Sequence, residues 1–293
     1  MTPAPDRRAA WDRFWHRPES ARNLAVARVL LAGTALWMVL SRAALPEIGG
    51  LPEEMFARVS PERRLRFLML LGPGAERALF ALLHVSLLGA LLGVRPRVTC
   101  LLSSVLLYHF APYETIIRSP NPYLRGFTLP TLGLAILAAA PCADALRFRS
   151  RDAVAPSAAR YRWALALVQV VFCQVYFFAG YAKLVTSGLA WMAPANMRAY
   201  LLLLNQGLTA APEATAGYAL AQSPMLLSAL AVLGLAFELS FPLVLFSSTA
   251  RRVLLPLAVV FHVGNAVLFR ISFQNFPLLL MFVDWGGERA EAA

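Results

Sequence analysis

The chain has 293 residues, of which 59% are hydrophobic and only 15% are charged, and its formal net charge is +11. Soluble domains carry about 25% charged residues, and the mean hydropathy of +0.60 moves the chain further from them. These values exclude an ordinary soluble protein and predict that lipid is the solvent for most of the chain. The basic charge does not indicate nucleic-acid binding, because the arginines are scattered between apolar segments and form no basic stripe.

Seven apolar segments approach the length that a membrane crossing requires, which is about 20 helical residues for a hydrocarbon core of roughly 30 Å. In chain order they cover residues 24–41, 78–94, 98–113, 126–146, 163–185, 224–250 and 253–269. An eighth apolar stretch, 276–283, is too short to span unaided. Backbone polar groups in lipid must be satisfied within the segment, so each span is expected to be an α-helix. No segment alternates with the period of two that a membrane β-strand needs.

The sequence therefore predicts an all-α fold, a polytopic transmembrane helical bundle of about seven to eight helices. A shorter apolar run within 187–206 predicts a short interfacial or re-entrant helix on the outer side. Residues 1–22 are expected to form a cytoplasmic N-terminal segment, 23–285 the transmembrane domain and 286–293 a short tail. In the sixth segment, Pro242 lacks a backbone donor and is expected to kink the helix.

Clustered arginines predict the orientation of the bundle. They precede the first segment and fill the connections between the second and third, fourth and fifth, and sixth and seventh. If every segment crosses once, all four clusters lie on one side, which the positive-inside rule makes cytoplasmic. We therefore expect an integral membrane protein with a cytoplasmic N-terminus, and residue 155 on the same side. No short apolar core with a small-residue cleavage site precedes the first segment, so no cleavable signal peptide is expected.

Lysine usage points to one candidate for chemistry. Of the 27 lysine and arginine residues only Lys183 is a lysine, and it lies near the end of the fifth segment. Arginine stays charged, whereas a desolvated lysine can act as a base or nucleophile. The alternative is a lysine that extends to the interface, near Trp191. Glu238 and His262 also lie within spans, where ionisable residues are often functional. Their structural alternative is a hydrogen bond between helices, with Glu238–Arg28 and Glu238–His262 the simplest pairs.

Polar groups at the outer ends of the segments could converge with Lys183 and His262 on one outward-facing pocket. Nearby aromatic side chains could line an apolar slot for a flat ring, although such residues also mark the membrane interface. These aromatic residues are Tyr176, Phe177, Phe178, Tyr181, Phe273 and Phe276. Haem or metal ligation by His84 and His109 is less favoured than a polar contact within the bundle. The three cysteines lack metal-ligand spacing, so no metal site is expected.

Four stretches resemble a known family. Residues 176–184 read Tyr-Phe-Phe-Ala-Gly-Tyr-Ala-Lys-Leu and resemble the lysine-bearing helix of vitamin K-dependent γ-carboxylase and of the broader HTTM (horizontally transferred transmembrane) domain. The stretches 237–241 and 261–277 follow with similar spacing. Residues 119–126 resemble the family's outer turn, but Asn121 stands where the family has its catalytic histidine. The resemblance spans most of the chain and is most specific from 176 to 277.

The resemblance implies a membrane enzyme of the carbon–carbon lyase class. In it Lys183 is the base that deprotonates a reduced quinone, either vitamin K hydroquinone or menaquinol. With O2 the quinone becomes a strong base that removes a γ-proton from a glutamate side chain, to which CO2 adds. Lys183, His262 and Glu238 are then the catalytic candidates. The candidates for substrate and quinone binding are Asn121, Tyr123, Tyr181, Arg198, Asn265 and Arg270. The implied partners are membrane lipid, the quinone and a peptide or protein substrate, in a bacterial inner membrane.

Two alternatives stay open. The soluble C-terminal domain that helps the carboxylases to hold protein substrates has no counterpart after the last apolar stretch, so a small-peptide substrate, or quinol oxygenation without carboxylation, fits as well. The second alternative is a non-catalytic membrane partner or transporter that binds lipid or quinone. A transporter is expected to have broken helices in two repeated halves, and the sequence has no such repeat. An enzyme needs Lys183 in a closed site with hydrogen-bond partners, whereas an anchor would extend to lipid headgroups.

Overall fold

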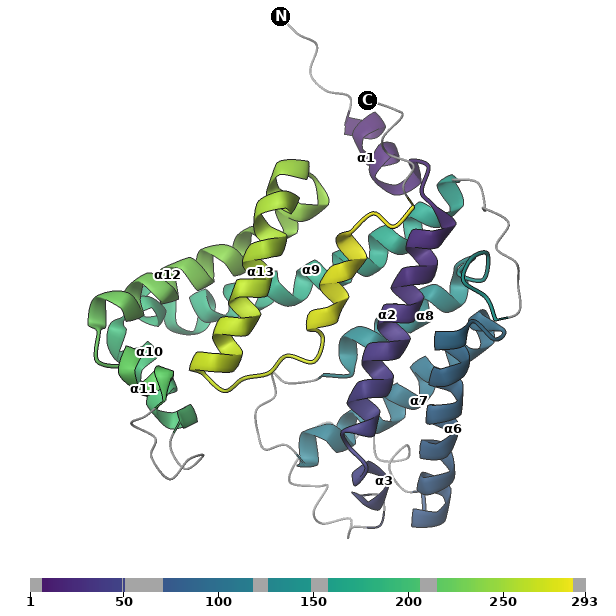
Figure 1. Cartoon of the computed structure of the whole chain (residues 1–293), viewed down its shortest axis with the longest axis horizontal. Coiled ribbons are helices and arrows are strands. Elements are labelled where there is room, and N and C mark those ends of the chain that lie inside the picture. The colour runs from purple at the N-terminus through teal and green to yellow at the C-terminus, as the bar shows by residue number, and fades with distance from the viewer. Residues whose placement is uncertain are drawn as a thin grey trace, which may run out of the picture. The chain divides into compact units, whose positions relative to one another are not determined.

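The computed structural model describes residues 7–48, 50, 71–117, 126–148, 158–205 and 215–286. All regular elements within these residues are helices (Figure 1), which confirms the predicted all-α class. The chain divides into two compact units, Met1–Val168 with Leu280–Ala293, and Gln169–Leu279. Each unit is described by itself.

The first unit is a group of helices that are mostly apolar, apart from the polar α1. It contains α1 (Arg7–His16), α2 (Ala21–Leu40), α3 (Leu45–Ile48), α6 (Pro73–Leu92), α7 (Pro96–Ile117), α8 (Thr128–Ala139) and the start of α9 (Ala159–Ser187). α2 packs against α6, α6 against α7, and α7 against α8. α6 begins with Pro73 and ends at Leu92, and the capping residue Gly93 has a φ of 73°, in the left-handed region. A side chain is strained at that φ, and a Cβ there would lie 2.7 Å from the carbonyl oxygen of Leu146, so glycine is required.

The fourth predicted span is shorter than the sequence suggested. Only 12 residues of 126–146 form a helix, α8, which covers about 18 Å. The chain then continues in turns, and two arginines hydrogen-bond to the backbone carbonyls that these turns leave open. Arg28 donates to Cys142, at 2.7 Å, and to Leu146, while Arg97 donates to Ala140 at 3.2 Å. Non-helical backbone at membrane depth is tolerated where protein groups satisfy it, so the buried Arg28 serves backbone carbonyls rather than Glu238.

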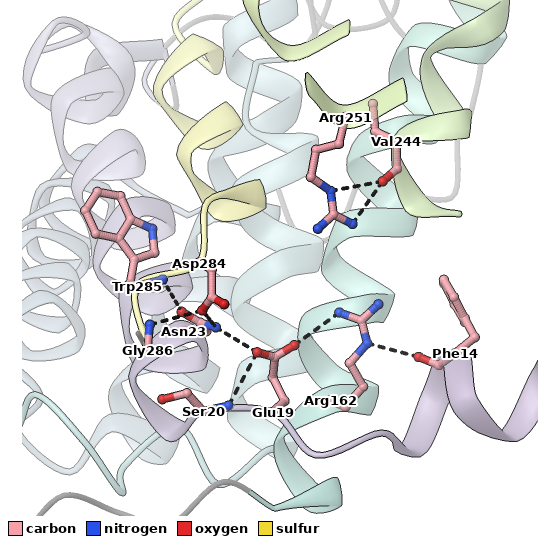
Figure 2. A network of polar contacts seen from close by, with 10 residues as sticks. All are labelled: Phe14, Glu19, Ser20, Asn23, Arg162, Val244, Arg251, Asp284, Trp285 and Gly286. Carbon is pink, nitrogen blue, oxygen red and sulfur yellow. Dashed lines mark hydrogen bonds and ion pairs between the residues drawn. The ribbon is translucent and has the colours of Figure 1, made fainter. Parts of the chain in front are cut away.

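A buried polar network joins three distant parts of the first unit (Figure 2). The Glu19 carboxylate, which precedes α2, accepts from Asn23 at 2.7 Å and from Arg162 of α9 at 3.3 Å. Asn23 also donates to Asp284 at 2.8 Å and accepts from the backbone N–H of Trp285 at 2.7 Å. The network therefore ties residues near the C-terminal end of the described chain to the start of α2.

The second unit contains the remainder of α9 and the helices that follow it. These are η2 (Gly188–Met192), α10 (Pro194–Asn205), α11 (Ala216–Leu220), α12 (Pro224–Ser240), η4 (Phe241–Leu245), α13 (Ser248–Leu268) and part of η5 (Phe276–Phe282). α10 is the short helix expected within 187–206. α12 changes into the 3₁₀ turns of η4 at Phe241, next to Pro242, as the missing donor predicts. Arg251 donates twice to the carbonyl of Val244 in η4, at 3.2 and 3.0 Å (Figure 2).

Five of the described helical stretches are long and apolar enough to cross a membrane. They are Ala21–Leu40, Pro73–Leu92, Ala159–Met192, Pro224–Leu245 and Ser248–Leu268. Large apolar side chains along them are exposed, including Val253 and Val260 of α13 at 59% and 65%. Such exposure is costly in water and neutral in lipid. The chain is therefore an integral membrane protein.

Candidate functional site

Lys183 makes an ion pair inside the second unit. Its Nζ donates to both carboxylate oxygens of Glu238, so α9 and α12 are joined at this point. The Glu238 side chain is only 5% exposed and that of Lys183 is 26% exposed. The ring of Trp191 lies 5.3 Å from Nζ, within reach of a cation–π contact. Lys183 thus has a buried carboxylate as its partner, unlike a lysine whose charge is held only by lipid headgroups.

Gly180 explains how the two helices approach each other at this pair. A Cβ on Gly180 would lie 3.1 Å from Cβ of Glu238 and 3.1 Å from Cγ of Leu239, which is tighter than ordinary van der Waals contact. Small residues let membrane helices pack closely. Because Lys183 lies three residues after Gly180, it shares that face of α9 and reaches the carboxylate directly.

A second polar pair lies on the same face of α9. Tyr176 precedes Gly180 by four residues and Lys183 by seven, the spacing of one helical face. Its hydroxyl lies 2.6 Å from Nε2 of His262, which α13 supplies. The other ring nitrogen of His262, Nδ1, is buried and has no hydrogen-bond partner among the described residues. Tyr176 was expected only to line an aromatic slot. Its seven-residue offset from Lys183 is the sequence signal that the two side chains share a face of α9.

Aromatic rings enclose the Tyr176–His262 pair. Tyr176 stacks on Phe241 with centroids 4.1 Å apart, and Phe237 meets it edge-on at 5.6 Å. His262 makes T-shaped contacts with Phe273 and Phe276, whose ring centroids lie 5.2 and 5.3 Å away. The surroundings of the imidazole are therefore apolar, which strengthens any hydrogen bond made there and makes an unpaired polar atom costly.

The predicted binding residues are distributed differently. Tyr181 is 51% exposed and stacks on Phe177, and Arg198 and Arg270 are exposed as well. Asn265 donates to the carbonyl of Phe261 within α13, at 2.8 Å. The two candidates from the outer turn, Asn121 and Tyr123, lie outside the described residues, so the predicted common cavity of these two with Lys183 and His262 stays a prediction.

The two alternative pairs predicted for Glu238, with Arg28 and with His262, are both wrong. Glu238 is bound by Lys183, His262 by Tyr176, and Arg28 by backbone carbonyls. A plain helix-to-helix salt bridge remains compatible with this geometry, because Lys183 and Glu238 satisfy each other.

A separate buried polar cluster lies in the first unit. His109 was considered from the sequence, but its partner Glu76 and the neighbouring Tyr113 were not. Glu76 of α6 is fully buried, and its two oxygens are 2.9 Å from Nε2 of His109 and 2.8 Å from the hydroxyl of Tyr113, both on α7. His84 contacts the carbonyl of Phe80 at 2.7 Å. Both histidines therefore make the polar contacts within the bundle that the sequence favoured over ligation. Within the described residues no three His, Cys, Asp or Glu side chains are grouped as metal ligands would be.

The model of the HTTM domain matches residues 16–284. The chain belongs to the HTTM domain family. Both polar pairs of the second unit lie inside the matched region, and the family is related to the membrane domain of γ-carboxylase, as the sequence motifs predicted. Comparisons with curated proteins and with solved structures gave no match.

Proposed function

We propose that this HTTM domain protein is a membrane enzyme that uses the Lys183–Glu238 pair as a base toward a reduced quinone, vitamin K hydroquinone or menaquinol, with O2 as the oxidant. The observation that carries the proposal is the position of the only lysine in the chain, which is held by a buried carboxylate within the family-matched helices. The chain otherwise uses arginine rather than lysine for positive charge, and unlike arginine the lysine at this point can become neutral.

The pair can exist in two forms that have the same net charge. In one form Lys183 is an ammonium and Glu238 a carboxylate. In the other the shared proton has moved to Glu238, and the amine has an unshared electron pair with which it accepts a proton from an acidic O–H. The pair is neutral in both forms, so the second form avoids separated charges in apolar surroundings. An arginine at the same position has no comparable neutral form.

The residues present fit a quinone as the bound group. A quinone is a flat apolar ring with polar oxygens. The second unit offers a base, a wall of phenylalanine rings and a buried imidazole nitrogen that has no hydrogen-bond partner among the described residues. Sites of this kind, mostly apolar with a few placed polar groups, are typical for cofactors. When bound, a reduced quinone would supply an acidic O–H and the electrons that reduce O2.

The finer features of the proposal come from the family relation. They are carboxylation of a glutamate-type or small-peptide substrate with CO2, a carbon–carbon lyase activity, and a place in the bacterial inner membrane with a cytoplasmic N-terminus. His262 is assigned to the same site as Lys183 and Glu238. The competing function is a non-catalytic lipid- or quinone-binding partner, in which the mutually satisfied Lys183–Glu238 pair only fastens α9 to α12.

The test is a direct assay for quinone turnover. Purified protein in micelles receives menaquinol under air, and mass spectrometry follows the quinone with time, with and without CO2 and a glutamate-containing peptide. An oxygenated quinone formed by the wild-type protein and not by Lys183→Arg supports the proposal. Equal conversion by the two proteins, or by micelles without protein, contradicts it.

A further inference from the structure

We infer that His262 and Tyr176 form a ligand-binding element in which Nδ1 of His262 donates a hydrogen bond to a ring oxygen of a planar aromatic ligand. Tyr176 acts there as a positioning residue that fixes the imidazole. The inference rests on the proposed function only for the identity of that ligand as a quinone, and it concerns binding rather than proton removal by Lys183.

The hydrogen bonds of His262 carry the inference. A neutral imidazole has one N–H donor and one bare nitrogen acceptor. The phenol of Tyr176 is the better donor of the two groups, so it donates to Nε2 across their 2.6 Å separation and the ring proton lies on Nδ1. That N–H is buried and has no acceptor among the described residues. Buried donors are rarely left unpaired in proteins, and an unpaired one suggests a missing ligand.

The packing of Tyr176 explains why the imidazole keeps this arrangement. Tyr176 is 7% exposed, and its ring packs with Phe241, stacked at 4.1 Å, and with Phe237, in a T-shaped contact at 5.6 Å. Its hydroxyl therefore has a fixed direction and defines both the tautomer and the tilt of His262. Groups that contact a ligand need such support to hold their geometry.

The walls of the element indicate the class of ligand. Phe273 and Phe276 follow α13 and make T-shaped contacts with the imidazole, with ring centroids 5.2 and 5.3 Å away. Rings prefer such edge-to-face or offset contacts with a further aromatic ring. A sugar or phosphate would bring more polar groups than this element can pair. A quinone ring brings an apolar face and an oxygen acceptor in its oxidised and reduced forms alike, so binding does not require turnover.

The distance along α9 separates this element from the base. Tyr176 and Lys183 are seven residues apart, which is about 10 Å of helix rise. Ligand binding at Nδ1 and proton removal at Nζ are thus assigned to different groups of one helix face, and they can be measured separately.

The experiment measures the affinity of the full-length protein in micelles for oxidised menadione, 2-methyl-1,4-naphthoquinone, without a reductant. Tryptophan fluorescence quenching reports binding, and 1,4-dimethylnaphthalene, which has no oxygen, is the matched ligand. His262→Phe keeps an aromatic ring but removes both nitrogens, and it is expected to weaken menadione binding about tenfold. Its affinity for 1,4-dimethylnaphthalene should stay within about twofold of wild type.

Tyr176→Phe tests the positioning role. It keeps the stack on Phe241 and removes only the hydroxyl, so the preference for menadione over 1,4-dimethylnaphthalene should fall severalfold. A merely structural role would change the affinities for both ligands together. His262→Asn restores an N–H donor near the Nδ1 position and should retain part of the preference, which also covers the case in which His262→Phe does not fold.

Two results would overturn the inference. One is an unchanged preference for menadione in well-folded His262→Phe and Tyr176→Phe. If His262→Phe does not fold, an unchanged preference in Tyr176→Phe and His262→Asn has the same meaning. The other is a wild-type protein that has no preference for menadione. Arg77→Leu, at an exposed ion pair of the first unit, should bind menadione like the wild type. The turnover assay compares Lys183 variants, whereas this binding assay compares His262 and Tyr176 variants without a reductant, so a failure of one assay and a failure of the other point to different residues.

Discussion

Lys183 and Glu238 meet where Gly180 brings α9 and α12 together, so the candidate base sits at a helix–helix contact. Its environment is thus determined by packing. A loop that moves a lysine toward a substrate is not needed, because the carboxylate that shares its proton is already in contact. The pair has a proposed chemical role, which quinol turnover measures, and a structural role in holding the two helices, which unfolding measures.

Lys183→Arg should abolish quinol turnover and leave the fold intact. Arginine keeps the charge and can still pair with Glu238, but it cannot become a neutral amine. General-base catalysis contributes roughly 10² to 10⁴ in rate, so the loss is readily measured. Lys183→Ala assayed with added ammonia or a small amine is the companion variant. Partial rescue by the amine indicates a missing base, whereas wild-type turnover by Lys183→Arg would make Lys183 an anchor.

The two halves of the ion pair should have unequal effects on stability. Lys183→Met strands the Glu238 carboxylate, which is 5% exposed, and should lower the free energy of unfolding by about 3 kcal/mol. Glu238→Leu strands a lysine that is 26% exposed and can reach solvent, so its cost should be smaller. The double variant should regain most of the wild-type stability, measured by thermal unfolding in micelles. A double variant as unstable as the sum of the singles would show that these residues make separate contacts.

Gly180→Val should destabilise the second unit. Its Cβ would press on Glu238 and Leu239 from 3.1 Å, and overpacking of this kind costs about 1–3 kcal/mol. Gly264→Val is the matched control, because a Cβ at this α13 position meets nothing within 4 Å. The thermal midpoint should fall for the first variant and change little for the second. Equal shifts would mean that loss of glycine in a helix, rather than the α9–α12 contact, determines the effect.

Most helices were predictable because the length and apolar character of each run determine its state in lipid. The end of α8 was not, because it depends on Arg28, which donates to carbonyls 114 and 118 positions away. Lys183 and Glu238 were each recognised as candidates, yet their pairing depends on the register of two helices. The partnership of His262 with Tyr176 was missed for the same reason, since no local pattern encodes a contact 86 residues apart.

Arg162→Leu should weaken the first unit strongly. Arg162 and Glu19 are 2% and 3% exposed, and removing one partner of a buried pair costs about 3–5 kcal/mol. Arg77→Leu is the control, because the Arg77–Glu47 pair is 63% and 57% exposed. The guanidinium of Arg77 hydrogen-bonds to Glu47 and lowers the pKa of that carboxyl, but solvent screens the pair. Thermal unfolding should therefore shift for Arg162→Leu and barely move for Arg77→Leu. A small shift for both would show that the network of Figure 2 adds little to stability.

Ala155→Cys should be shielded from a membrane-impermeant thiol reagent added to intact cells. Residue 155 lies outside the described residues, in the arginine-rich connection that the positive-inside rule places in the cytoplasm. The native thiols Cys100, Cys142 and Cys173 are all buried, so they give little background. Gly74→Cys is the matched probe, because it lies at the exposed start of α6, on the side predicted to face outward. The reagent should label position 74 in intact cells and position 155 only after the membrane is permeabilised. Labelling of position 155 in intact cells would reverse the proposed orientation and place the α9 end that carries Lys183 toward the cytoplasm.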